Sequence, residues 1–314
     1  MSAGLTERVL AGERRAIARA ISAVENETAE AGPILKRINA FLGRARVLGI
    51  TGPPGAGKST LTSALIGEYL RRGERVAVVA VDPSSPLSGG AILGDRIRMS
   101  AHQADERVFI RSVASRGHLG GLSRTAARVI DVLDAAGFGV VIVETVGAGQ
   151  AEVEIGLLAD TRLVLCPPGL GDEVQAIKAG LFEIADIYVI NKSDLPAADG
   201  VERELLAMIA LRAYAGWTPR VVRTVATSGE GVPALAEAIA ARETVGSARA
   251  GRRERIRRLL AAGAADWLRG RIESLPELEQ LCDAFGRGEI EPQEAWSKAA
   301  ALVIGKAKKQ GSGI

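Results

Sequence analysis

Residues 52–59, Gly-Pro-Pro-Gly-Ala-Gly-Lys-Ser, constrain the fold of this chain more than any other stretch. They match the pattern of glycine, four residues, then Gly-Lys-Ser, which is typical of phosphate-binding loops. The pattern predicts a buried strand over residues 46–51 and a helix that opens at Thr60. Glycines let a backbone wrap around a pyrophosphate with its N–H groups pointing inward, at the positive end of a helix. A plain Gly/Pro turn is the alternative, but the flanking strand and helix favour a phosphate loop.

Each residue of this loop is a candidate for contact with phosphate. Lys58 can reach the outer phosphates, and the Ser59 hydroxyl can ligate Mg²⁺. The complete candidate set is Gly52, Pro53, Pro54, Gly55, Ala56, Gly57, Lys58, Ser59 and Thr60.

Beyond this loop, apolar strands alternate with helices. Fully apolar strands separated by helices indicate a parallel sheet covered on both faces. We therefore predict an α/β fold of the P-loop NTPase type, in which ligands bind beyond the carboxyl ends of the strands. The strands expected after the first one cover residues 75–81, 109–110, 139–143, 162–166, 186–190 and 220–225.

Three parts are expected along the 314 residues. Residues 1–45 form an N-terminal helical extension, with helical spacing over 5–28 and a second short helix over 34–42. Residues 46–245 form the P-loop domain. Residues 246–314 form a helical arm that begins with a run of arginines. For that run a solvated helix face or a dimer seam is favoured over a nucleic-acid surface.

The composition excludes several classes of protein. A net charge of +3 with 4% aromatic residues does not point to a nucleic-acid partner. The two cysteines form no pair motif, which suits a reducing compartment. The first residues lack the apolar core of a signal peptide, and no apolar run approaches ~18 residues. We expect a soluble cytoplasmic protein with no membrane partner.

The tetrapeptide Asn191-Lys192-Ser193-Asp194 follows a predicted strand, about 130 residues after the phosphate loop. The Asp194 carboxylate can accept hydrogen bonds from N1–H and the 2-amino group of guanine, a donor pair that adenine lacks. Asn191 would hold N7 and pin the loop, while the Lys192 stem lies along the ring. After the next strand, Ala226 and Thr227 are expected to contact the guanine oxygen through their backbone. An Asx turn is the alternative interpretation of the tetrapeptide.

Further polar residues stand at or near other strand ends. Asp82, Asp95 and Glu144 could reach Mg²⁺ directly or through water, because this cation prefers oxygen ligands. The Gly147 N–H is suited to sensing a γ-phosphate. Arg98 is a candidate cation near that phosphate, with a surface or coupling arginine as the alternative.

Five segments together resemble the MeaB family, the G-protein chaperones of adenosylcobalamin-dependent methylmalonyl-CoA mutase that are also labelled arginine/ornithine transport kinases. The segments are 52–59, 81–85, 94–99, 144–150 and 191–194. The resemblance implies that GTP binding and hydrolysis gate cofactor loading and protect the mutase, with hydrolysis slow when the client is absent. It implies a homodimer made through the C-terminal arm, and an adenosylcobalamin that belongs to the client and is not bound directly.

The same resemblance implies a third switch over residues 168–178, which couples the nucleotide to the client. Its candidate coupling residues are Asp172, Gln175 and Lys178.

Three alternatives stay open. A nickel-insertion GTPase needs clustered soft or imidazole ligands, whereas His102 and His118 stand alone and Cys166 has no adjacent histidine. A transport-associated kinase would use ATP, against which Asp194 argues. A switch that binds GTP without appreciable hydrolysis is the third alternative, because no residue of the sequence is clearly identified as a catalytic arginine.

Overall fold

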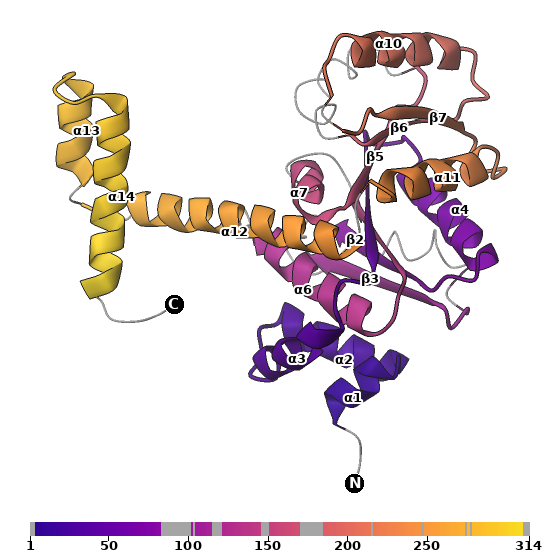
Figure 1. The fold of residues 1–314 in the computed structure, drawn as a ribbon, viewed down its shortest axis with the longest axis horizontal. Helices are drawn as coiled ribbons and strands as arrows, with labels where there is room; N and C mark the ends of the chain where they lie inside the picture. Colours follow the sequence, from indigo (N-terminus) through magenta and orange to yellow (C-terminus); the bar gives the residue numbers. More distant parts are fainter. Residues whose placement is uncertain are drawn as a thin grey trace. The chain divides into compact units, whose positions relative to one another are not determined.

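The computed structural model divides the chain into two compact units, Met1–Ile256 and Arg257–Ile314, and each is described by itself (Figure 1). The residues described are 4–82, 102, 104–114, 121–145, 151–169, 185–214, 216–245, 248–273, 275–276 and 278–309.

A seven-stranded sheet forms the core of the first unit. Its strand order is β3-β2-β4-β1-β5-β6-β7, and every neighbouring pair is parallel. The order places the strand that leads into the phosphate loop, β1, at the centre of the sheet. The strands are β1 (Arg46–Thr51), β2 (Val76–Asp82), β3 (Val108–Ala114), β4 (Val140–Thr145), β5 (Thr161–Leu165), β6 (Ile187–Asn191) and β7 (Arg220–Thr224).

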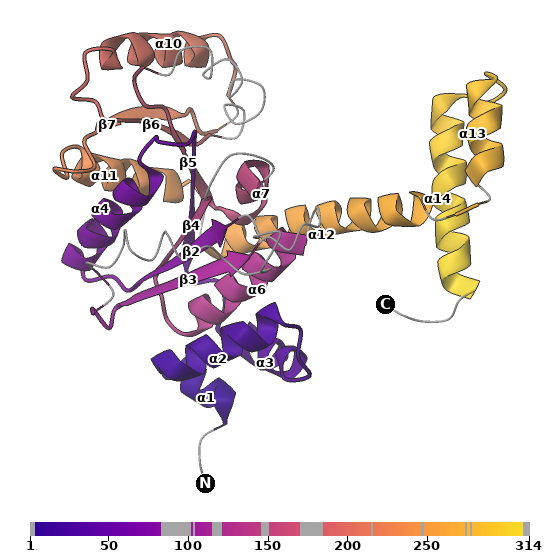
Figure 2. The same cartoon turned by 180° about the vertical axis from the view of Figure 1, so that it is seen from behind.

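Helices cover both faces of this sheet, as the apolar strands predicted. On one face, α4 (Lys58–Arg71) and α11 (Val232–Glu243) pack in a cluster with Leu48 and Ile50 of β1. On the other face lie α6 (Gly121–Ala135), α7 (Ala151–Leu158) and α10 (Ala198–Ala210), which contact neighbouring strands (Figure 2). The α7 helix approaches β1 so closely that a Cβ on Gly49 would lie 2.4 Å from Cγ2 of Ile155.

The N-terminal extension is divided differently from the prediction. The single helical run expected over residues 5–28 is two helices, α1 (Leu5–Leu10) and α2 (Arg14–Glu25). Gly12 adopts a left-handed backbone (φ +76°) between them, which ends α1 although the apolar spacing continues across the break. The next helix, α3 (Ala31–Ile38), begins before the expected residue 34 and is followed by a 3₁₀ turn, η1 (Asn39–Phe41). The α2 helix packs on α6.

The arginine run lies in α12 (Ala248–Glu273), a helix that starts in the first unit and continues into the second. Arg255 is only 3% exposed, and its Nη1 lies 3.0 Å from Oδ1 of Asp160. Nε of Arg252 lies 3.5 Å from Oδ1 of Asp131 on α6. Two arginines of the run therefore bind carboxylates inside the first unit, and for the buried Arg255 the expectation of a solvated helix face was wrong.

Within the second unit, α12 is followed by α13 (Leu278–Gly286) and α14 (Pro292–Lys309). The α14 helix begins at Pro292, whose fixed φ suits the first turn of a helix. The α13 and α14 helices contact each other, with Leu278, Ala295 and Val303 buried. The described part of this unit contains no strand. Among the described residues of the whole chain, no helix is both long and apolar enough to cross a membrane.

Candidate nucleotide-binding site

The phosphate loop connects β1 to α4 at the carboxyl edge of the sheet, and two of its glycines are required by close contacts. Gly57 has φ +87°, and a Cβ there would lie 2.4 Å from Nδ2 of Asn191. Gly52 has φ +144°, and a Cβ there would lie 2.8 Å from the carbonyl oxygen of Leu165. Both positions combine a backbone conformation that favours glycine with no room for a side chain. The loop is thus held by β5 and by the end of β6.

Lys58 opens α4 and is 8% exposed. Its ammonium donates hydrogen bonds to the loop's own carbonyls, at 2.7 Å to Gly52 O and 3.1 Å to Pro53 O. The charge is therefore held against the loop, at the end of the helix where the backbone dipole also favours an anion. The position suits a phosphate-binding lysine.

Glu144, near the end of β4, is fully buried below this loop. Its Oε1 accepts a hydrogen bond from the Ser59 hydroxyl at 3.1 Å, and its Oε2 accepts one from the Thr62 hydroxyl. The strand register sets Glu144 opposite Ile50 of β1. The structure thus brings together two of the predicted Mg²⁺ ligands, Ser59 and Glu144.

Two further buried hydroxyls lie at the carboxyl edge of the sheet, where a hydrated Mg²⁺ would have to fit. Oγ1 of Thr51, at the end of β1, and Oγ1 of Thr145, at the end of β4, find no hydrogen-bond partner among the described residues. Buried polar atoms are normally paired, by protein or by ordered water. Successive side chains of a strand point to opposite faces, so these hydroxyls lie on the face away from Glu144. The oxygens of Glu144 and Ser59, which are within hydrogen-bond distance of each other, are hard donors of the kind that Mg²⁺ prefers. The backbone of Asp82 ends β2 on the neighbouring strand, where Val81 is in register with Thr145.

Asn191, the last residue of β6, ties three segments together and is 2% exposed. Its Nδ2 donates to the carbonyl of Ala56 in the phosphate loop at 2.8 Å. Its Oδ1 accepts hydrogen bonds from the backbone N of Ala226 at 3.1 Å and from Oγ1 of Thr224 at 3.2 Å. One side chain therefore connects the phosphate loop to β6 and β7, the strands that lead into the residues predicted to bind guanine, 191–194 with Ala226 and Thr227, which are called the guanine motif below.

The guanine motif forms one wall of a pocket of about 250 Å³. Lys192 has φ +61°, and this left-handed residue turns the chain sharply after β6. The pocket is lined by Gly57, Thr60, Asn191, Lys192, Asp194, Leu195, Val225, Ala226 and Thr227. All five residues predicted to bind guanine therefore line one cavity, together with two residues of the phosphate-loop region.

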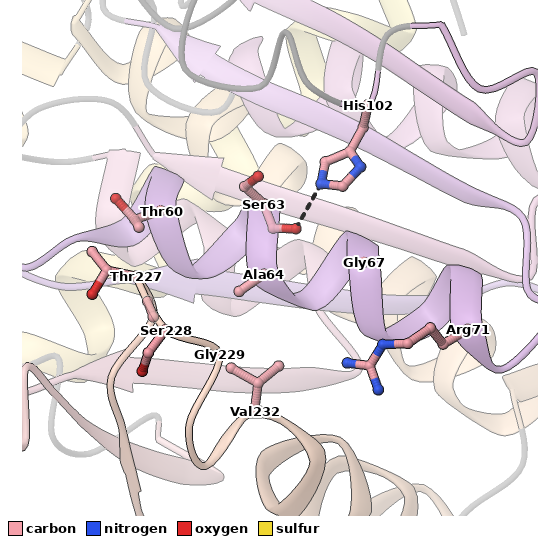
Figure 3. Close-up of a pocket in the computed structure, with 11 residues that line it drawn as sticks. Thr60, Ser63, Ala64, Gly67, Arg71, His102, Thr227, Ser228, Gly229 and Val232 are labelled. Carbon is pink, nitrogen blue, oxygen red and sulfur yellow. Dashed lines mark hydrogen bonds between the residues drawn. The ribbon is translucent and has the colours of Figure 1, made fainter.

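A second, more open cavity of about 620 Å³ runs along α4 beside the first (Figure 3). Thr60, Ala226 and Thr227 line both cavities. His102 and Arg71 line the far part of this larger cavity. Nε2 of His102 lies 3.0 Å from the carbonyl oxygen of Ser63, and Arg71 lies in the last turn of α4. Because three residues line both cavities, the pocket of the guanine motif, called the base pocket below, is continuous with the larger cavity along α4.

Comparison with known proteins identifies the family to which this protein belongs. A family model described as "Methylmalonyl Co-A mutase-associated GTPase MeaB" matches residues 17–275. The chain belongs to the MeaB family. A relative from Pyrococcus horikoshii, named as a GTPase, is 45% identical over 311 residues, which are 96% of this chain and 98% of that protein. The GTPase ArgK of Escherichia coli is 41% identical over 275 residues, 85% of this chain and 82% of that protein.

The fold of this MeaB-family protein is shared with a solved structure titled "Crystal structure of LAO/AO transport system kinase". The TM-score is 0.74 at 29% identity, covering 95% of this chain and 96% of that one. The predicted P-loop α/β fold, the GTPase activity and the family resemblance are thus confirmed. The protein is a member of a family of GTPases associated with methylmalonyl-CoA mutase.

The described residues of the MeaB-family protein hold no group of three or more His, Cys, Asp or Glu side chains that could bind a metal. Burial raises the pKa of the Cys166 thiol to about 12, so it stays protonated and is a poor soft ligand. The protonated thiol counts against Cys166 as a nickel ligand. Six predicted residues lie outside the described part of the chain: Asp95, Arg98, Gly147, Asp172, Gln175 and Lys178.

Proposed function

We propose that this protein is a Mg²⁺-dependent, GTP-hydrolysing chaperone that gates cofactor loading and protects an adenosylcobalamin-dependent acyl-CoA mutase of the methylmalonyl-CoA type. The observation that carries the proposal is the pocket that joins Asp194 to the phosphate loop through Asn191, in a chain of a mutase-associated family. Adenosylcobalamin is bound by the client and not by this chain.

Base selection depends on Asp194. Its carboxylate would accept from N1–H and the 2-amino group of guanine, whereas adenine would leave it without those donors. A site built around such hydrogen bonds can reject the wrong ligand by on the order of 10⁴-fold, because buried polar groups would stay unpaired. Lys192 and the backbone of Ala226 and Thr227 complete the pocket.

The phosphates are handled at the other end of the same site. Lys58 would exchange the carbonyls of its own loop for the outer phosphates, a charge-assisted contact. Ser59 and Glu144 would hold Mg²⁺, with Asp82 and Asp95 as further candidates. The ion, when bound, neutralises charge on the transferred phosphoryl group. We propose Gly147 and Arg98 as the residues that contact the γ-phosphate.

Coupling to the client is proposed for the segment that contains Asp172, Gln175 and Lys178. A loop near the nucleotide that orders differently with and without γ-phosphate can change the affinity for a partner. We further propose that the helical arm, residues 246–314, makes a homodimer, and that the protein acts in the cytoplasm. The family's association with methylmalonyl-CoA mutase supports the choice of client.

The test is calorimetric titration of a mutase with the wild type and with Asp194→Asn, each loaded with guanosine or xanthosine diphosphate or with a non-hydrolysable triphosphate analogue. The wild type should change its affinity for the mutase about 5- to 150-fold between guanosine states, which is the usual range of such couplings. Asp194→Asn should respond only to xanthosine nucleotides, whose C2 oxygen accepts from the new amide.

Asp199→Asn, an exposed substitution on α10, is the matched control and should behave as the wild type. Equal mutase affinity in every nucleotide state would refute the chaperone role. A wild type that binds adenosine nucleotides as well as guanosine nucleotides would refute the assignment of the pocket.

A further inference from the structure

Thr62 is a residue of the site that the sequence patterns did not single out. It lies in α4, three residues after Ser59, and is fully buried. Its neighbours on the buried side of the helix, Leu61, Leu65 and Ile66, are apolar. A hydroxyl in such surroundings costs free energy unless it is hydrogen-bonded. The Thr62 hydroxyl meets this need by donating to Glu144.

The two oxygens of the Glu144 carboxylate are shared between two hydroxyls of one helix. Ser59 contacts Oε1 and Thr62 contacts Oε2. Positions three apart on a helix lie on the same face, so α4 presents both donors to the end of β4. A carboxylate buried in this way has few orientations that satisfy both of its oxygens.

We propose that Thr62 is a positioning residue that sets the Mg²⁺ affinity of the site by fixing the carboxylate of Glu144. The inference rests on the proposed Mg²⁺-dependent function. Thr62 is too deeply buried to bind the nucleotide, so its effect passes through Glu144. With Oε2 anchored, Oε1 stays aimed at Ser59, the side chain predicted to ligate the ion. Groups that orient metal ligands in this way change metal affinity by about 10- to 100-fold.

The experiment uses the full-length protein carrying a fluorescent GDP, and measures the nucleotide dissociation rate as the concentration of free Mg²⁺ is varied. Thr62→Val keeps the shape of the side chain and removes the hydroxyl. It should raise the Mg²⁺ concentration for half-maximal slowing of dissociation by about 10- to 100-fold. The rate in excess chelator should stay within about threefold of the wild type. Thr62→Ser restores the donor and should return the midpoint to within about threefold of the wild type.

Thr161→Val is the matched control, since Thr161 is a buried threonine at the opposite, amino-terminal end of β5, and its midpoint should not move. If Thr62→Val fails to fold, as judged by near-ultraviolet circular dichroism, Thr62→Ala takes its place with the same expected shift. A midpoint unchanged in the folded variant would overturn the role of Thr62 alone. A wild type whose dissociation ignores Mg²⁺ would overturn both this inference and the proposed Mg²⁺ dependence.

Discussion

Replacing Asn191 with alanine should weaken the fold and the nucleotide site together. The substitution removes three buried hydrogen bonds at once, to Ala56 O, Ala226 N and Thr224 Oγ1. It also leaves those three partners without the side chain that satisfied them. Because the phosphate loop and the guanine motif are connected through this amide, their relative placement loses its restraint.

The expected magnitude follows from these contacts. A protein hydrogen bond contributes about 1 kcal/mol net, so three of them give about 3 kcal/mol of unfolding free energy. Partners left buried and unsatisfied raise the loss, and water that enters the space of the lost amide lowers it. A loss of about 3 kcal/mol is a large part of the 5–15 kcal/mol that stabilises an ordinary domain. If the GDP-bound state loses about 1.4 kcal/mol more than the free folded state, GDP affinity falls by about tenfold.

Urea unfolding without nucleotide measures the first quantity, and calorimetric titration with GDP measures the second. Asn39→Ala is a suitable control, because that asparagine is exposed and its amide accepts only a 3.3 Å contact from Arg252. The control should change stability by no more than about 0.5 kcal/mol. An Asn191→Ala protein within about 1 kcal/mol of the wild type, with unchanged GDP affinity, would refute the reasoning.

Two further outcomes are expected. Gly57→Ala places a methyl group 2.4 Å from Nδ2 of Asn191 on a left-handed backbone, so GDP affinity should fall at least about tenfold, which titration calorimetry can check. Burial favours the neutral acid at Asp186, but the hydrogen bonds and charges of Arg162 and Arg242 outweigh it and hold its pKa below the ordinary value. Its stabilising contribution is therefore present above pH ~4 and is lost as the pH falls through the lowered pKa. Asp186→Asn should lower the free energy of unfolding, measured with urea at pH 7, by about 2 kcal/mol, a value kept modest because both arginines are partly exposed. The difference from the wild type should shrink toward pH 2. A difference that stays constant with pH would contradict this reasoning.

The sheet could be predicted from the sequence because its strands carry their own signal. Runs such as residues 140–143 are short, apolar at every position and made of β-branched residues, which is typical of a strand covered on both sides. The phosphate loop and the guanine motif were also visible, since each has fixed residue types next to a strand. What local spacing could not show was the break at Gly12, because the apolar pattern of residues 5–28 continues across it.

Contacts between distant segments were the other gap. The hydroxyl of Thr62 gains a meaning only when Glu144, on another strand, lies opposite it. Arg255 belongs to a run that reads as solvated, and its partner Asp160 is 95 residues away. Such pairs depend on the tertiary arrangement, which no residue spacing encodes.

The strand order has a consequence for how the nucleotide acts during folding. The phosphate loop follows β1, whereas Asn191 ends β6, two strands away in the sheet and 135 residues from Ala56 in the chain. A partly folded chain that has formed β1 to β4 lacks the residues after β6 and β7 that line most of the base pocket. Contacts so distant in sequence are costly to close and form late. The full GDP site therefore exists only after β5, β6 and β7 have joined the sheet. Bound GDP then stabilises the protein by slowing the unfolding of those strands.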